Sequence, residues 1–177
     1  LCTGHLAMRQ WWLRGSTEND NNDTKHVDTL EDFKNEIYWN EDEDGTIIPW
    51  LDRANISILM YAVGANRVNT VKTILKLYLS DASRILAHAF SSKGVLNLAI
   101  PPKLTCLMAG MAYASKEIIV ELLSAGADPH ATDISGHDAL HFCCLVGNLN
   151  NVKTWFERLE DWNVNKRSLK FGSTALQ

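Results

Sequence analysis

The sequence predicts an all-α solenoid, in which antiparallel helix pairs are stacked and joined by turn or hairpin loops. Three observations predict this class. A segment pattern that begins at Thr105 returns at Asp138. Residues whose side chains cap helices stand just before each apolar-periodic segment. Small residues recur inside these segments, where one helix must approach its neighbour closely. A sequence pattern that recurs at an interval of about 33 residues is typical of stacked repeat proteins.

Three copies of the repeated unit are recognisable. The clearest runs from Asp133 to Phe156 and reads D-I-S-G-H-D-A-L-H-F-C-C-L-V-G-N-L-N-N-V-K-T-W-F. The copy before it runs from Thr105 to Asp128 and closes with L-L-S-A-G-A-D. A third starts at Asp52 and continues through an apolar segment to Leu75. Partial copies stand at Gly4 to Leu13 and from Gly172 onward.

Local chemistry supports helices at these places. Ser57, Thr105, Asp138 and Thr174 share one motif position, and an oxygen on each side chain can accept hydrogen bonds from free amides at a helix start. Small residues stand where the first helix of a unit packs closely, and glycines or Asn55 stand where a turn needs positive φ. The small residues are Ala62, Gly110, Cys143 and Cys144, and the turn glycines are Gly136 and Gly172.

These motifs resemble the ankyrin repeat, whose pattern reads D-x-x-G-x-T-P-L-H-x-A-A followed by G-x-L-x-x-V. The interval from Thr105 to Asp138 equals the ankyrin period of about 33 residues. The motif proline is absent from every copy, where Ile58, Cys106, Ala139 and Ala175 stand instead. The motif histidine is present only as His141. The resemblance therefore implies an array of less uniform repeats, which apolar stacking still stabilises.

The resemblance divides the chain into seven segments. Residues 52–80, 104–132 and 133–165 are expected to be repeats. Residues 1–13 are expected to be the second helix of a truncated repeat, and residues 166–177 the start of a further truncated repeat. The spacing breaks at 14–51 and at 81–103, which are interpreted as insertions.

Each insertion is expected to contain a helix. Asp28 and Glu31 offer a capping box for an amphipathic helix over about 28–39. That helix either lies against its own repeats or docks a partner. In the second insertion, Asp81 can cap a short helix through Ile85, Leu86, Ala89 and Phe90.

Charge and cysteine content limit the partners. Residues 15–46 contain eleven acidic residues and two lysines, a local charge of −9, which leaves +5 for the rest of a chain whose net charge is −4. Such a segment argues against nucleic acid as a partner. The four cysteines show no disulfide spacing, which favours reduced thiols in an intracellular, cytoplasmic protein. No apolar run approaches the about 18 residues of a membrane helix, so no membrane partner is expected for this chain.

Candidate chemistry is weak. Asn40 to Ile47 is similar to the start of a calcium loop, but Leu51 stands where a bidentate Glu is needed, which favours an ordinary acidic turn. His137, His141 and Cys144 can share a helix face, although a motif histidine and a core cysteine are the simpler interpretation over zinc. The sequence contains no Gly-rich phosphate loop, nucleophile elbow or H-E-x-x-H motif. We therefore expect a non-enzymatic chain without a cofactor or metal.

The expected function is the binding of another protein. In the ankyrin family the turn tips and the exposed face of each first helix form a concave ledge. The ledge of this chain would be unusually apolar, which marks either a partner site or a surface covered by other parts of the same protein. The alternatives are a targeting or regulatory segment of a multidomain enzyme, and a calcium- or metal-responsive module. The expected ledge residues are Arg53, Ile56, Tyr113, Ile134, Ser135, His137, Leu145, Val146, Lys170 and Phe171.

Overall fold

The computed structural model describes residues 39–41, 47–52, 57–78, 82–87, 89–90 and 103–177. These residues are mostly helical, which confirms the predicted helical class. The helices predicted over 1–13 and about 28–39 lie outside them, except that Trp39 belongs to a strand and not to a helix. Arg53, Asn55 and Ile56 also lie outside the described residues.

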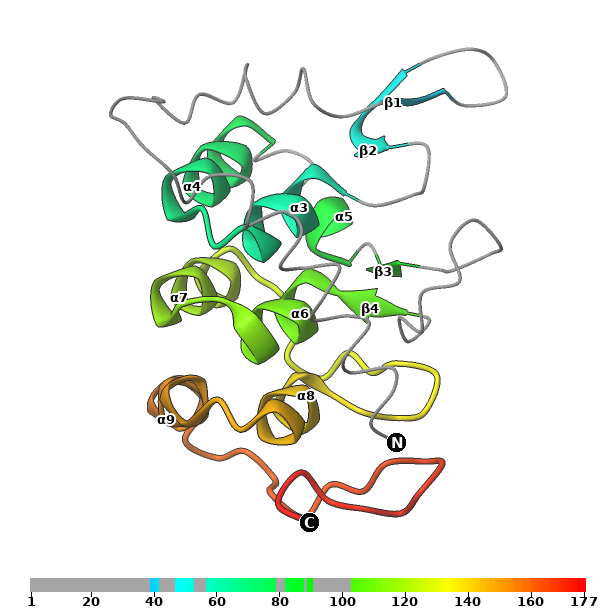
Figure 1. Ribbon diagram of the computed structural model, residues 1–177, viewed down its shortest axis with the longest axis vertical. Coiled ribbons are helices and arrows are strands. Elements are labelled where there is room, and N and C mark those ends of the chain that lie inside the picture. The colour runs from blue at the N-terminus through cyan, green and yellow to red at the C-terminus, as the bar shows by residue number, and fades with distance from the viewer. Residues whose placement is uncertain (1–38, 42–46, 53–56, 79–81, 88, 91–102) are drawn as a thin grey trace, which may run out of the picture.

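Three helix pairs form the body of the part of the chain that the structure describes (Figure 1). In each pair the chain reverses direction at a short turn, and the two helices pack against each other. The first helices of the pairs contact one another in series, and so do the second helices. The pairs are α3 (Ile58–Gly64) with α4 (Val68–Leu77), α6 (Cys106–Tyr113) with α7 (Lys116–Ser124), and α8 (Ala139–Val146) with α9 (Leu149–Arg158).

The predicted caps start the first helices. The side-chain oxygens of Ser57, Thr105 and Asp138 accept hydrogen bonds from the backbone N–H three residues later, at 3.1, 3.3 and 3.1 Å. Each bond satisfies an amide that has no partner within its helix. Thr174 differs, because it begins a turn in which the N–H of Gln177 donates to its carbonyl at 3.3 Å.

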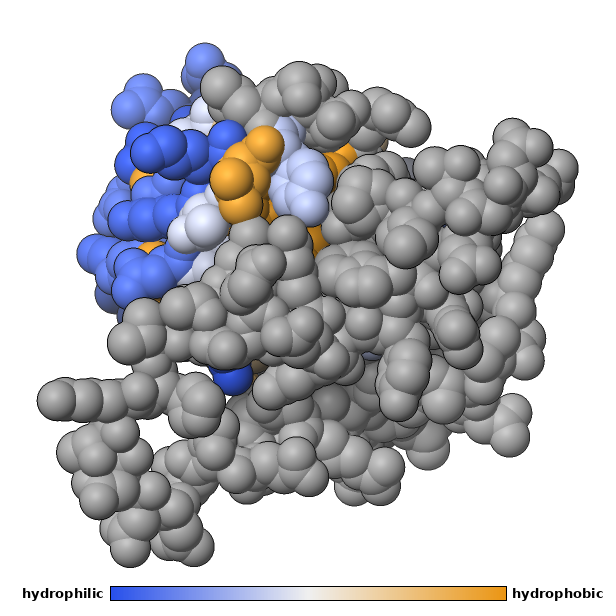
Figure 2. All heavy atoms as spheres, turned by 90° about the horizontal axis from the view of Figure 1, so that it is seen from above, coloured by the Kyte–Doolittle hydropathy of each residue, from blue (hydrophilic) through white to orange (hydrophobic). Residues whose placement is uncertain are grey.

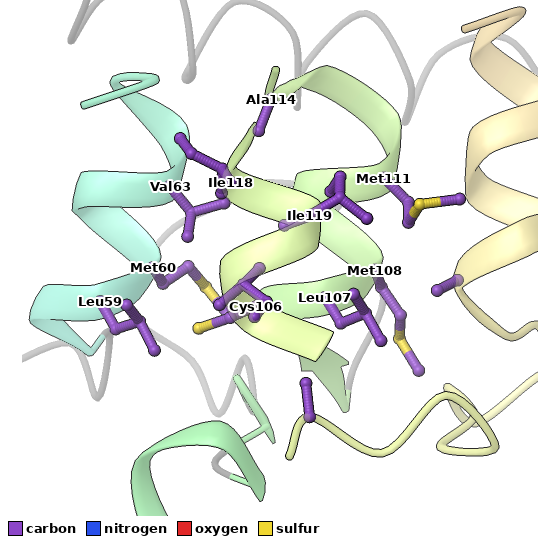
Figure 3. Packing of buried hydrophobic residues seen from close by; sticks show 14 of the residues in the cluster. Leu59, Met60, Val63, Cys106, Leu107, Met108, Met111, Ala114, Ile118 and Ile119 are labelled. Carbon is purple, nitrogen blue, oxygen red and sulfur yellow. The ribbon is translucent and has the colours of Figure 1, made fainter. Parts of the chain in front are cut away.

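Helix α6 lies in the middle of the apolar core. All its residues from Cys106 to Ala112 are buried, and apolar side chains of α3 point toward them (Figure 3). Gly110 permits this packing, because an added Cβ would lie 3.1 Å from Ile119 Cδ1 and 3.3 Å from Val63 Cγ1. The predicted need for a small residue at this position is therefore confirmed.

Two asparagines of the third pair bind the carbonyl end of α6. Asn151 is buried, and its Nδ2 donates to Ala114 O at 2.8 Å and Met111 O at 3.2 Å. Asn148 Nδ2 donates to Ala112 O at 3.3 Å. The last carbonyls of a helix lack partners within it. These two side chains supply partners and fix how α9 sits against α6.

The remaining elements are short. Strand β1 (Trp39–Glu41) pairs antiparallel with β2 (Ile47–Asp52). Strand β3 (Ala89–Phe90) pairs with β4 (Leu104–Thr105). Helix α5 spans Ala82–Ala87, so the helix predicted to include Ala89 and Phe90 ends before them. The physical reason is pairing, since β4 leads directly into α6 and offers hydrogen-bonding groups to the backbone of these two residues.

The second helices present a polar surface. Hydrophilic residues gather on the side where α4, α7 and α9 lie in Figure 1, as Figure 2 shows from above. Lys72 of α4 and Glu121 of α7 form an ion pair there at 3.4 Å. Within the described residues, no helix has the length and apolar content that crossing a membrane requires.

Candidate functional site

Two loop tips at the C-terminal end of the molecule lie against each other. The first is Asp133–His137, before α8, and the second is Ser168–Ser173. The N–H of Lys170 donates to Ser135 O at 3.1 Å. Gly136 has φ +78°, and a Cβ added there would lie 2.5 Å from the backbone N of Leu169. The predicted positive φ at Gly136 and Gly172 is confirmed, and the contact makes the two tips one continuous surface.

His137 connects these tips to α8. Its ring stacks on Phe171 with centroids 6.0 Å apart and an interplanar angle of 22°. It also meets the edge of Phe142 at 6.2 Å. One carboxylate oxygen of Asp133 accepts a hydrogen bond from the His137 backbone N–H at 2.7 Å, and the other lies 3.2 Å from His137 Nδ1. His137, which was expected at a loop tip, is therefore half-buried and in contact with Asp133, Phe142 and Phe171.

A charged cluster lies at the start of α8. Asp138 Oδ1 is 2.7 Å from His141 Nδ1, and Lys166 Nζ is 3.4 Å from Asp138 Oδ2. Burial raises the pKa of Asp138, but the hydrogen bonds from the His141 ring and backbone lower it more, so it lies below its ordinary value. Burial lowers the pKa of His141, and the hydrogen bond and charge of Asp138 outweigh this, so it lies above its ordinary value.

A pocket of about 330 Å³ opens between α8 and the C-terminal turn. One wall is formed by His137, His141, Phe142, Cys144 and Leu145, and the other by Ser173, Thr174, Ala175 and Gln177. This volume is at the small end of the about 300–1,000 Å³ range of ligand pockets.

Most of the expected ledge residues near this pocket are exposed. Leu145 is 64% exposed, Ile134 58% and Phe171 52%. Lys170 is also exposed, with Nζ 5.2 Å from the centre of the Phe171 ring. Val146 differs, because it is half-buried and packs against the core.

Tyr113 lies in a different place. It lines a polar groove of about 590 Å³ at the starts of α7 and α9, together with Lys116, Glu117 and Lys153. The expected ledge is therefore divided, since His137, Leu145, Lys170 and Phe171 are brought together and Tyr113 is not.

The described cysteines are wholly or partly buried, and the two histidines considered for a metal site are engaged by other side chains. Burial raises the pKa of Cys106 and Cys143 to about 12, and burial also raises the pKa of Cys144, so these thiols stay protonated and are weak nucleophiles. Among the residues described, no three His, Cys, Asp or Glu side chains are placed to hold a metal ion. The Nδ1 atoms of His137 and His141 are each engaged with an aspartate. Most of the calcium-like loop falls in 42–46, outside the described residues.

Several residues of this surface were not identified from the sequence. Leu169 is 84% exposed at the second tip, and Lys166 joins the Asp138 cluster. The spacing of Asp133 and His137, and of Asp138 and His141, was a usable signal, because residues three or four apart face each other when the chain is helical or turned. No local signal marked Leu169 or Lys166, since their neighbours come from other parts of the chain.

The sequence was compared with known proteins. No family model matches it, and no curated protein matches it.

Proposed function

We propose that this chain is an ankyrin-type repeat array that binds another protein through the surface formed by the two loop tips and the exposed face of α8. We call this the tip surface, and it consists of Ile134, His137, Leu145, Leu169, Lys170 and Phe171. The observation that carries the proposal is the joining of the two tips. Their contact brings Ile134, Leu169 and Phe171 onto one surface, which Leu145 on the adjoining α8 extends, and each of these four residues is more than half exposed.

Three features support the repeat assignment. Thr105 and Asp138 stand one ankyrin period apart, and both cap the first helix of a pair. The helix pairs also contact in series, as stacked repeats do. Gly136 and Gly172 have positive φ at equivalent turn positions of consecutive units.

Exposure of apolar side chains supports binding. Single exposed apolar residues are ordinary on protein surfaces, but contiguous groups commonly mark sites of interaction. Rigid framing lowers the entropy cost of binding, because little has to be ordered when the partner arrives. The role proposed is recognition and not catalysis, in line with the protonated thiols of the described residues.

A paired substitution tests the proposal. The chain is used to purify partners, and the binding of one purified partner is then measured with Leu145→Asp and Leu149→Asp variants. Leu145 and Leu149 are 64% and 62% exposed, on α8 and on the polar outer helix α9, respectively. We expect Leu145→Asp to weaken binding by at least about tenfold and Leu149→Asp to leave it unchanged, with equal melting temperatures. Equal binding by both variants would contradict the proposed surface.

A further inference from the structure

The tip surface combines its apolar side chains with positive charge. Residues 162–177 contain Lys166, Arg167 and Lys170 and no acidic residue. Arg167 and Lys170 are exposed, whereas Lys166 is half-buried at the Asp138 cluster. The cations therefore lie on the same short segment as Leu169 and Phe171.

The acidic side chains in the first tip and directly after it do not cancel this charge. Asp133 and Asp138 are 5% and 0% exposed, and both are engaged with histidines. Asp138 is also ion-paired with Lys166. The accessible charge is that of Lys170 on the second tip and of Arg167 directly before it.

These cations are held in place. Arg167 Nη1 donates to Gly172 O within the second tip, at 2.6 Å, which leaves its other N–H donors available. Lys170 Nζ lies over the Phe171 ring, and Phe171 stacks on His137, which also lines the pocket. The Lys170 cation, the exposed Phe171 ring and the His137 ring therefore follow one another across the surface.

We propose that the tip surface binds an acidic segment of a partner protein, in which a large apolar side chain packs against the exposed Leu145 and Phe171 while flanking carboxylates contact Lys170 and Arg167. Charge complementarity specifies the flanks, because carboxylates match exposed cations and a basic segment would be repelled. The apolar side chain supplies affinity by burying its surface against Leu145 and Phe171. This inference rests on the proposed function and adds the chemistry of the partner.

Selection from a displayed library of short random peptides tests the proposal on the full chain. We expect the selected peptides to be enriched in Asp and Glu around a large apolar residue. Raising the salt from about 0.05 to 0.5 M should weaken their binding several-fold, because salt screens exposed charges. Selected peptides that are neutral or basic would overturn this inference and leave the proposed function standing, whereas failure of any peptide or protein partner to bind would overturn both.

Matched variants locate the site. Lys170→Glu should lower the affinity of the selected acidic peptides at least about tenfold, and Lys153→Glu, an exposed lysine on α9, should not. Leu145→Ser should lower it with the melting temperature unchanged, and Leu149→Ser should not. Equal effects of the tip and α9 variants would overturn the assignment.

Two further measurements test two other possible occupants of the tip surface. Sedimentation equilibrium that shows a dimer abolished by Lys170→Glu would assign the surface to a second copy and overturn the proposal. A synthetic peptide of residues 15–46 that binds the tip surface more tightly than the selected peptides would assign it to the acidic segment of the chain itself, with the same consequence.

Discussion

Helices α6 and α8 have the same length and similarly apolar sequences, but the structure uses them differently. In α6, CLMAGMAY is buried from Cys106 to Ala112, between α3 and α8. In α8, ALHFCCLV is buried only to Cys143, and Leu145 is 64% exposed. Their composition alone does not explain this, because every residue of α6 and every residue of α8 except His141 is apolar. The difference teaches that the neighbours of a helix decide which of its apolar residues stabilise the fold and which remain available for binding.

Truncation of one side chain in α6 and one in α8 should give the largest difference in the free energy of unfolding. We expect Met111→Ala, which removes a fully buried side chain, to lower the free energy of unfolding by about 2–5 kcal/mol. Leu145→Ala should change it by less than about 0.5 kcal/mol, because most of that side chain is already in water. Urea unfolding of both variants measures the difference. Similar losses would break the comparison between the helices.

Contact between the loop tips beside α8 should produce the next largest effect. An alanine at Gly136 must adopt a positive φ and also meets the backbone of Leu169, so we expect Gly136→Ala to cost about 2–3 kcal/mol. Gly147 has a similar φ of +79° but nothing within 4 Å of an added Cβ, so Gly147→Ala should cost only about 1–2 kcal/mol. Thermal unfolding of the two variants isolates the contact. Equal losses would show that the tips do not support each other.

Removal of the hydrogen bonds that link α9 to the carbonyl end of α6 should give the next largest loss of stability. Asn151→Ala leaves carbonyls of α6 without their buried donor, and we expect a loss of about 1–3 kcal/mol. The neighbouring Asn150 is exposed, and Asn150→Ala should have almost no effect. Denaturant unfolding compares the pair. A neutral Asn151→Ala would mean that apolar packing alone joins α6 to α9.

The smallest effect should appear in the pH dependence of stability, and α8 should be its source. At the equivalent positions α6 has Met108 after Thr105, with no ionisable pair, whereas α8 has His141 after Asp138. The raised pKa of His141 adds stability that is complete below its unfolded value of about 6.5 and is lost as the pH rises through the folded value. The lowered pKa of Asp138 adds stability present above about 3.9 and lost as the pH falls through its folded value.

Stability should therefore be greatest between these two pKa values and should decline above about pH 6.5. Chemical unfolding at a series of pH values measures this, with His141→Gln as the control that removes the decline at high pH. A wild-type profile that does not decline there would contradict the role given to the His141–Asp138 pair.

Local chemistry made part of the site predictable. The left-handed turns needed glycine, and Gly136 and Gly172 adopt them. Exposure of Ile134, Leu145 and Phe171 followed from their places at a turn tip or on the outer face of a first helix. The burial of Asn151 was signalled faintly, since it stands where the preceding unit has the apolar Ile118. The separation of Tyr113 from the tip surface had no such signal.

The sequence by itself determined where the first helix of each pair starts and that the turns at Gly136 and Gly172 need glycine, because a cap or a positive φ depends on residues within one turn of chain. Only the tertiary structure decided that Ala89 and Phe90 pair as a strand, that Asn151 serves the carbonyls of α6, and that Leu169 rests against Gly136. Each of these joins residues that are far apart along the chain. Such contacts are set by how the layers pack, and packing depends on the whole chain at once.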